Sequence, residues 1–517
     1  MRHLILLAAT LLCTAAASAV EKDQHGIITQ QPEGTLRLYQ RTGSSTWASL
    51  YFMDASQDGI LAEVVFSEDG TKAYFHNIIS HAATGAWVEG DVEGNTITVP
   101  LGQVVNWWDE DDNGNKNYGM QLARVKVNGN IDTYTVDTKG SVTFTIDGND
   151  LRLNDTSGDT DNKLYDGLGL VYTGAFANEW SYYLDYETVM HFKDVTPVTL
   201  PEGVETETFS MEYTSTSGHK TGQLVDVAFV GQDIYIHGAS HEQLPDAWMR
   251  GTVNRDHVVF PLQYAGHTVS YMLYFCGVYP TYAQGDDGYW NWFYGWEDGS
   301  ITFDFDQRKR ILSAPTMALA ANSSETGIDR AEIMIAPTFR PFEEIPATPA
   351  EPSIAYYQDM GAFSILMLDV PLLDTEGNFL NPSKVSYQLY VDDDEPYTLY
   401  PDEYKRLSEP IDEVPYFFSD EEREAFNRSY IYEKGSYIYL FQKGMERIGI
   451  QTIYRGGGEE HRSAINYYKL DGDHIADTPK ATAPVSHYDL MGRPVANGHR
   501  GLTITRRADG SVVKHWQ

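Results

Sequence analysis

A pattern centred on tryptophan occurs twice in this chain, about 160 residues apart. The first copy reads VVFSEDGTKAYFHNI…GAWVEGDVEGNTITVPLGQ, and the second reads VAFVGQDIYIHGA…DAWMRGTVNRDHVVFPLQ. Trp87 matches Trp248 and Gly90 matches Gly251 at the same spacing, which is typical of one module duplicated with small changes in loop length. Every matched position reads as an apolar residue, a glycine or part of a turn. The duplication therefore constrains the architecture more than it constrains the activity.

Short runs in both copies alternate apolar with other residues and are separated by Gly, Asp and Asn, which is typical of antiparallel hairpins. The 35 tyrosines and 10 tryptophans also favour β structure, because such rings suit a half-buried pleated surface. We therefore predict an all-β protein with duplicated antiparallel β-meander domains over residues 34–194 and 206–341. About nine strands per copy would form a meander barrel or a two-sheet sandwich, and we favour the barrel-like form.

The proline-rich segment PFEEIPATPAEP separates the second copy from a third domain, predicted over residues 353–472. Its runs AFSILMLDV, KVSYQLYV, SYIYLF, RIGIQTIY and AINYYKL are typical of an immunoglobulin-like or fibronectin-like sandwich. Ser419 and Glu422 have the spacing of a capping box, so we expect one helix at SDEEREAF. Residues 487–517 are expected to form a short β-hairpin tail.

The first 19 residues have the features of a secretory signal peptide: a basic start, the apolar run LILLAATLL and a small-residue cleavage site. Nothing later in the sequence is long and apolar enough to cross a membrane. The formal net charge of −37 disfavours nucleic acid and anionic membranes as partners. Cys13 would leave with the signal peptide, and Cys276 is expected to be a buried strand thiol.

The tail HYDLMGRPVANGHRGLTITRRADGSVVKHWQ resembles the C-terminal sorting signals of proteins exported by the type IX secretion system of Bacteroidetes. The residues that carry this resemblance are Tyr488, Asp489, Gly492, Arg493, Gly501 and Lys514. It implies export to the cell surface or medium through that secretion machinery. Leu502 stands where those signals usually have an aromatic residue, and a plain β-hairpin is the alternative interpretation. With an inactive tail, the protein would stay in the periplasm.

The body of the chain also resembles a group of secreted proteins from gut and oral Bacteroidetes. Its most specific segments are LNPSKVSYQLYVDDDEPYT and RIGIQTIYRGGGEEHRSAI. Because that group has no assigned activity, the resemblance implies a cellular location and an architecture but no catalytic residues.

Two aromatic segments are candidate ligand-binding sites. In the second copy, DDGYWNWFYGWEDG contributes Tyr289, Trp290, Trp292, Tyr294 and Trp296. In the first copy, Trp107 and Trp108 occupy the comparable region. Exposed rings beside carboxylates can bind sugars, because the rings stack on C–H faces while the acids meet hydroxyls. The alternative is a buried aromatic plug under a long loop.

The segment WWDEDDNGN contains a candidate calcium site formed by Asp109, Asp111 and Asn113, followed by a glycine that allows a sharp turn. The twelfth position of this loop is Met120, where calcium loops of this type carry a bidentate glutamate. An acidic hairpin tip without metal is therefore the alternative, and no other cofactor is expected.

The sequence contains no G-x-S-x-G, H-E-x-x-H, phosphate-loop or C-x-x-C motif, so no catalytic residue is assigned. We predict a secreted or cell-surface non-catalytic protein that binds an extracellular glycan or host protein. A carbohydrate-active hydrolase with an acidic cleft stays open, because 74 acidic residues can form a catalytic pair that only a structure can locate. A structural spacer without a ligand is the third interpretation.

Overall fold

The computed structural model confirms the prediction of an all-β protein. Its helical elements are the α-helix α1 (Asp420–Asn427) and one short 3-10 helix (Pro382–Lys384), within the residues that the structure describes. The chain forms two compact units, one from Met1–Glu207 with Val225–Phe339 and the other from Thr208–Leu224 with Arg340–Gln517. The described residues are 20–48, 51–110, 114–216, 220–240, 243–284, 290–295, 299–322, 328–427, 429–471, 474–475, 486–488, 502–506 and 512–516.

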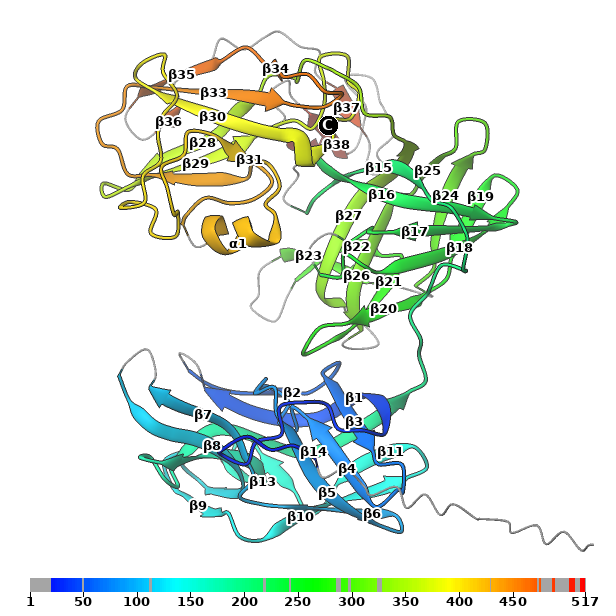
Figure 1. Cartoon of the computed structure of the whole chain (residues 1–517), viewed down its shortest axis with the longest axis vertical. Helices are drawn as coiled ribbons and strands as arrows, with labels where there is room; N and C mark the ends of the chain where they lie inside the picture. The colour runs from blue at the N-terminus through cyan, green and yellow to red at the C-terminus, as the bar shows by residue number, and fades with distance from the viewer. Residues whose placement is uncertain are drawn as a thin grey trace, which may run out of the picture. The chain divides into compact units, whose positions relative to one another are not determined.

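Eight strands of the first copy close into a ring, because the last strand pairs with the first (Figure 1). In order around the ring these strands are β1 (Thr35–Ala48), β3 (Leu61–Phe66), β4 (Lys72–His76), β5 (Trp87–Glu93), β6 (Thr96–Pro100), β10 (Ser141–Asp147), β11 (Asp150–Leu153) and β14 (Trp180–Lys193). Alternate side chains fill the interior, including Val64, Ile97 and Phe144. Gly90 belongs to this tight packing, because a Cβ there would meet the Ile97 side chain at 2.8 Å.

The second copy repeats the same ring, which confirms the duplication at the level of topology. Its strands are β15 (Glu207–Thr214), β16 (Lys220–Val230), β17 (Asp233–His237), β18 (Trp248–Asn254), β19 (His257–Phe260), β24 (Ile301–Asp306), β25 (Ile311–Ser313) and β27 (Ile328–Pro341). Gly251 lies at the position of Gly90, and a Cβ there would meet the Phe260 ring at 2.7 Å. Cys276 is fully buried as predicted, and burial raises its pKa to about 12.

Each ring continues into a second sheet through its long last strand. In the first copy this sheet adds β13 (Leu164–Gly174), β8 (Lys116–Asn128) and β7 (Val104–Glu110), and β2 (Phe52–Ser56) pairs with β1. The matching strands of the second copy are β26 (Thr316–Asn322), β21 (Met272–Cys276) and β20 (Gln263–His267). The copies differ in what is added. The first copy has β9 (Tyr134–Asp137) and β12 (Ser157–Asp159), and the second has a hairpin of β22 (Tyr279–Gln284) and β23 (Trp290–Gly295).

The third domain is a sandwich of two antiparallel sheets around one core. One sheet contains β28 (Ser353–Asp359), β29 (Ser364–Asp369) and β32 (Tyr437–Leu440). The other contains β31 (Val414–Pro415), β30 (Val385–Val391), β33 (Arg447–Tyr454), β34 (His461–Arg462), β35 (Asn466–Asp471) and β36 (His474–Ile475). The two sequence segments that carry the resemblance pair here as β30 and β33. The predicted capping box is confirmed, since the Glu422 amide donates to Ser419 Oγ at 3.3 Å and the Ser419 amide donates to Glu422 Oε2 at 2.8 Å.

The C-terminal residues form a three-stranded sheet of β37 (Ser486–Tyr488), β38 (Leu502–Arg506) and β39 (Val512–Trp516). In the described part of the chain, no helix is long and apolar enough to span a membrane.

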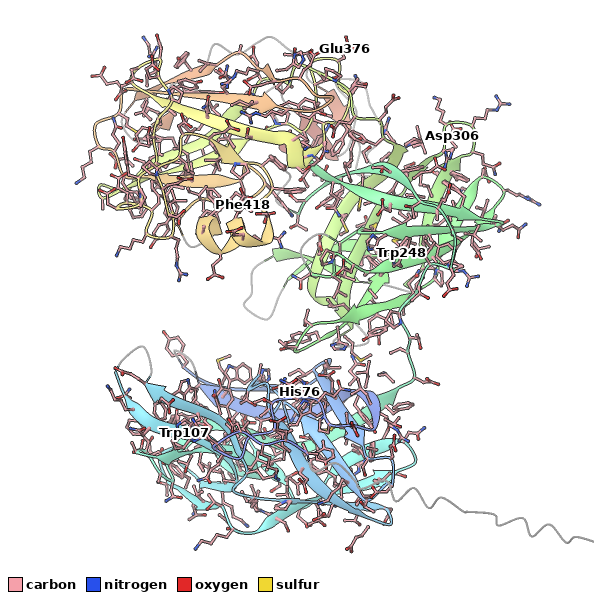
Figure 2. The ribbon with its side chains drawn as sticks, in the orientation of Figure 1. His76, Trp107, Trp248, Asp306, Glu376 and Phe418 are labelled. Carbon is pink, nitrogen blue, oxygen red and sulfur yellow. The ribbon has the colours of Figure 1, made fainter. Side chains whose placement is uncertain are left out.

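Polar residues are also duplicated, which corrects the expectation that every matched position is apolar, a glycine or a turn. In the first copy, His76 bonds to Glu63 through Nδ1 at 2.5 Å and its ring stacks on Trp87 at 4.8 Å. In the second copy, His237 contacts Asp226 at 3.4 Å and stacks on Trp248 at 4.7 Å. Figure 2 labels His76 in the first copy and Trp248 in the second. The sequence signal was present, because both histidines stand eleven residues before the matched tryptophan.

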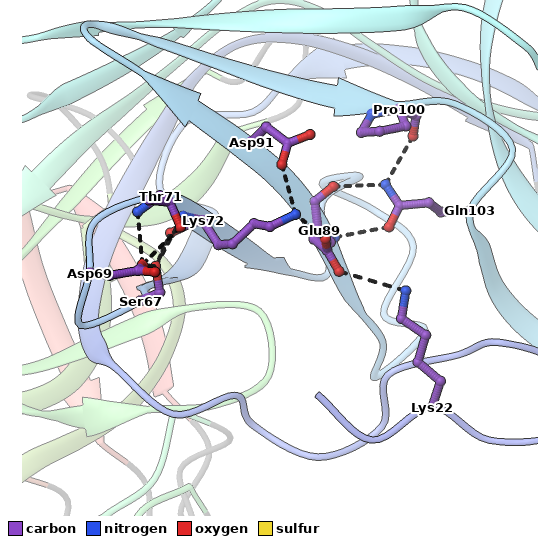
Figure 3. A network of polar contacts seen from close by, with 9 residues as sticks. All are labelled: Lys22, Ser67, Asp69, Thr71, Lys72, Glu89, Asp91, Pro100 and Gln103. Carbon is purple, nitrogen blue, oxygen red and sulfur yellow. Dashed lines mark hydrogen bonds and ion pairs between the residues drawn. The ribbon is translucent and has the colours of Figure 1, made fainter. Parts of the chain in front are cut away.

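A glutamine fastens the strand that carries this tryptophan in both copies. Gln103 accepts a bond from the Glu89 amide at 2.9 Å and donates to the Glu89 and Pro100 carbonyls (Figure 3). Gln263 makes the same three bonds to Arg250 and Pro261. Lys72 also lies between the Glu89 and Asp91 carboxylates. At the matching place in the second copy the charges are reversed, since Asp233 pairs with Arg250.

We predict that Gln103→Leu accelerates amide hydrogen exchange in the peptide covering 87–93 by roughly tenfold, because it removes bonds worth about 1 kcal/mol in net stability. Gln263→Leu should have the same effect on the peptide covering 248–254. Exchange followed by mass spectrometry measures both, and each variant is the control for the other copy. Equal acceleration of both peptides in either variant would contradict a local role.

A buried ion pair lies where β14 passes from the second sheet into the ring. Arg41 and Asp185 are 1% and 2% exposed, and Arg41 Nη1 lies 3.2 Å from Asp185 Oδ2. Arg41 also donates to the carbonyls of Asn77 and Ile78, while the Ser80 hydroxyl donates to Asp185 at 2.8 Å. Burial raises the pKa of Asp185 to about 6 although these contacts act to lower it. The pair therefore joins β1, β14 and the loop after β4.

We predict that Arg41→Met destabilises the protein by about 3–5 kcal/mol at pH 7.5, because Asp185 then stays buried without its cation. The loss should be smaller at pH 5. A carboxyl group whose pKa is raised in the folded state favours folding when protonated, and this contribution is lost as the pH rises through that pKa. Melting temperatures of both proteins at the two pH values measure the effect. An equal loss at both would mean that Asp185 does not titrate in this range.

Candidate functional site

The third domain contains a segment in which tyrosine alternates with buried aliphatic residues, YIYEKGSYIYLF. Ile431, Ile438 and Leu440 are fully buried in the sandwich core. Successive residues of a strand point to opposite faces, so the tyrosines between them lie on the outer face of the sheet. The alternation in SYIYLF predicts a strand, but these tyrosines were not among the candidate site residues.

Neighbouring strands extend the row of tyrosines across the sheet. Met367 of β29 lies opposite both Tyr356 and Tyr437, and Ile365 lies opposite Gln358 and Tyr439. The Tyr439 amide donates to the Tyr430 carbonyl at 2.9 Å, and the Tyr432 amide donates to the Tyr437 carbonyl at 3.0 Å, which adds the preceding segment. We call this surface the tyrosine face. It consists of Tyr356, Gln358, Phe363, Ile365, Met367, Tyr430, Tyr432, Tyr437 and Tyr439.

The rings of the tyrosine face stack on one another. Tyr432 and Tyr437 have ring centroids 3.9 Å apart with planes at 24°. Tyr439 lies between Tyr430 and Phe363, with centroids 5.1 Å from each and planes within 26°. Each such pair contributes about 0.5–1.5 kcal/mol beyond the burial of its area. The rings therefore hold each other in fixed orientations before any ligand arrives, which lowers the entropy cost of binding.

The nine side chains of the tyrosine face are uncharged, and three of them are exposed to solvent while the others are half-buried. Tyr430, Tyr356 and Met367 are 48%, 41% and 37% exposed. Partial burial raises the pKa of Tyr432 and Tyr439 above the ordinary value of 10.0, so their hydroxyls stay neutral and can both donate and accept. Contiguous exposed apolar area of this kind marks an interaction site in a soluble protein. The side chains can bind a ligand, and none of them is a nucleophile activated by a base.

The predicted aromatic site of the second copy is described in part. Trp290, Trp292 and Tyr294 lie on β23, opposite Gln284, Tyr282 and Pro280 of β22. Tyr289 and Trp296 lie outside the described residues. A sugar-binding role for this hairpin stays a prediction.

In the first copy, Trp107 and Trp108 lie on β7 and are partly buried. The Trp107 ring stacks on His25 at 4.3 Å and donates to Asp109 at 3.1 Å. The Trp108 ring stacks on Tyr118 at 4.9 Å. One ring is therefore covered by the segment before β1 and the other by its own sheet. The expectation that these tryptophans occupy the region comparable to the aromatic segment of the second copy is wrong, because β7 matches β20, whereas Trp290 and Trp292 lie on a hairpin between β21 and β24. A ligand-binding role for Trp107 and Trp108 stays a prediction.

The predicted calcium site is described only in part, so it stays a prediction. Asp109 is exposed, and Asp111 and Asn113 lie outside the described residues. In the part of the chain that is described, no group of three or more His, Cys, Asp or Glu side chains could hold a metal ion.

The sorting-like tail is likewise described only in its strands. Tyr488 lies opposite Ile504, which lies opposite Lys514. Asp489, Gly492, Arg493 and Gly501 lie outside the described residues. Export through the type IX machinery therefore stays a prediction.

Similarity to other proteins does not assign a role to the tyrosine face. The function must be inferred from the surface itself. No protein-family model, curated protein or solved structure matches this chain.

Proposed function

We propose that this protein is a secreted or cell-surface, non-catalytic binding protein whose tyrosine face holds a neutral polysaccharide. The observation that carries the proposal is an outer sheet face that contains five stacked aromatic rings, with a core of Ile431, Ile438 and Leu440 behind it. A sheet that serves only as structure needs an apolar inner face and a polar outer face. Here both faces are apolar, which favours a binding role over that of a plain spacer.

A neutral glycan suits the chemistry of the tyrosine face. Sugars have apolar C–H surfaces and many hydroxyl groups, and tyrosine offers a rigid ring together with a hydroxyl that donates and accepts. Tyrosine also contributes contact area at a low entropy cost, because its side chain has only two rotatable bonds. None of the nine side chains that define the face is charged, and the net charge of −37 repels acidic polymers. These features favour a neutral polysaccharide over a charged one.

The cellular location rests on the signal-like residues 1–19 and on the sorting-like tail. Both patterns support export, to the cell surface with an active tail and to the periplasm without one. A surface location would bring the tyrosine face to extracellular polysaccharides.

We predict that the double substitution Tyr437→Ala and Tyr439→Ala weakens retention by a neutral polysaccharide in affinity electrophoresis at least tenfold. Each removed ring takes one member from a stack, and central contacts of a binding surface cost more than 1 kcal/mol when truncated. The matched control is Tyr51→Ala, which removes a tyrosine that is 78% exposed in the first copy. It should leave the retention unchanged.

Two further measurements separate the outcomes. Tyr437→Phe with Tyr439→Phe keeps the rings and removes the hydroxyls, so its retention divides the effect between stacking and hydrogen bonding. Near-ultraviolet circular dichroism shows whether the alanine variant keeps its fold. Unchanged retention of a folded alanine variant would contradict the proposal. The proposal would also be contradicted if the wild-type protein bound no neutral polysaccharide but bound an acidic polymer or a host protein through this face.

A further inference from the structure

A cavity of about 630 Å³ opens on the second sheet of the first copy. Its walls are strands in the order β9, β8, β13 and β12. Its volume lies within the usual range for small-molecule sites, about 300–1,000 Å³. We call it the polar groove. The side chains on its open face are Lys126, Asn128, Thr133, Thr135, Ser157, Asp159, Leu164 and Asp166, of which the two aspartates are half-buried and the others exposed.

Strand register sets these side chains in two rows that cross the four strands. Lys126 lies opposite Thr135 on one side and Asp166 on the other, and Asp166 lies opposite Ser157. In the next row, Leu164 lies opposite both Asn128 and Asp159. Hydroxyl, ammonium, amide and carboxylate groups therefore face one space of small-molecule size.

The two carboxylates of the polar groove are held by partners within the chain. Asp166 accepts from Arg124 Nε at 2.6 Å and pairs with Lys126 at 2.7 Å. Burial acts to raise the pKa of Asp166, but these two cations hold it below its ordinary value. Hydrogen bonds from Asn162 likewise lower the pKa of Asp159. Both carboxylates are therefore ionised acceptors, whereas a glycosidase needs one carboxyl group that holds its proton. This chemistry favours binding over hydrolysis.

Several groups in the polar groove keep hydrogen-bonding capacity for a ligand. The hydroxyls of Thr133, Thr135 and Ser157 form no side-chain hydrogen bond to any described part of the chain. Lys126 uses one of its three N–H groups on Asp166 and has two left. Donors and acceptors on both sides match the hydroxyls of a neutral sugar.

The walls of the polar groove are fixed before a ligand arrives. Gly158 of β12 lies directly against the Tyr186 ring, and a Cβ at this position would approach that ring to 2.0 Å. The hydroxyls of Tyr165 and Tyr186 donate to the two oxygens of Asp54, each at 2.8 Å. The strand β12 therefore packs against the Tyr186 ring, which its hydrogen bond to Asp54 holds in place.

The polar groove belongs to the first copy alone among the described residues. The matching strands of the second copy, β21 and β26, pair with each other, but the described residues contain no strand that matches β9 or β12. The shared scaffold is therefore the same in both copies, and the walls of the polar groove are an addition to one of them. The described part of the second copy forms the same scaffold without counterparts of β9 and β12, so the scaffold does not need these two strands.

We infer that the polar groove is a second saccharide site, which takes one or two units of a neutral sugar through Lys126, Asp159, Asp166 and the surrounding hydroxyls. The ligand class rests on the proposed function, but the residues are different from those of the tyrosine face.

The test is isothermal titration calorimetry of the full mature chain against a panel of neutral monosaccharides and disaccharides. Lys126→Ala should weaken the binding of any active sugar at least tenfold, because it removes the donor at the centre of the groove. The matched control is Lys116→Ala, which removes a lysine from the same strand that also pairs with an acid, Glu110 at 2.8 Å. It should leave the binding unchanged.

The outcomes separate this inference from the proposed function. The inference is supported if Lys126→Ala loses the heat of sugar binding while Lys116→Ala and the tyrosine double variant keep it. This holds whatever the polysaccharide retention shows. No heat with any sugar of the panel at millimolar concentration overturns it. Equal binding by Lys126→Ala and the wild-type protein also overturns it, even where the tyrosine face is confirmed.

Discussion

The pairing of the first strand with the last is the constraint on which each duplicated copy depends. In the first copy β1 pairs with β14 over nearly its whole length, with a shift at Gly43, where a Cβ would lie 2.6 Å from the Glu187 carbonyl oxygen. Closure removes the sheet edges of the ring and encloses its interior. It also leaves the first half of β14 free to pair with β13, so one long strand supports both the ring and the second sheet.

The buried Arg41–Asp185 pair stands at this junction. A buried ion pair is costly unless hydrogen bonds complete it, and here the loop after β4 supplies them through Asn77, Ile78 and Ser80. In the second copy Ser240 donates to Glu332 of the last strand at 2.6 Å, which repeats the link between loop and strand. Both copies thus fasten the same loop with a carboxylate, and in the first copy that carboxylate also pairs with an arginine.

The two proposed sites follow one rule, since each is added to a scaffold that is complete without it. The polar groove is completed by β9 and β12, which have no match among the described strands of the second copy. The tyrosine face uses the outer surface of a sheet whose inner surface already forms the core. A rigid scaffold with variable additions is a common basis for binding proteins, because the additions can change without unfolding the core.

The sequence by itself determined the all-β class, the duplication, the buried Cys276 and the helix cap at Ser419. These features depend on period-2 patterns, turn residues and local spacing, which are visible along the chain. The tertiary structure alone decided the ring closure and the two candidate sites. Tyr356, Met367 and Tyr437 are far apart in sequence, and so are Thr135, Lys126, Asp166 and Ser157. Strand register brings each group together, and register depends on which strands pair, which one sequence does not specify.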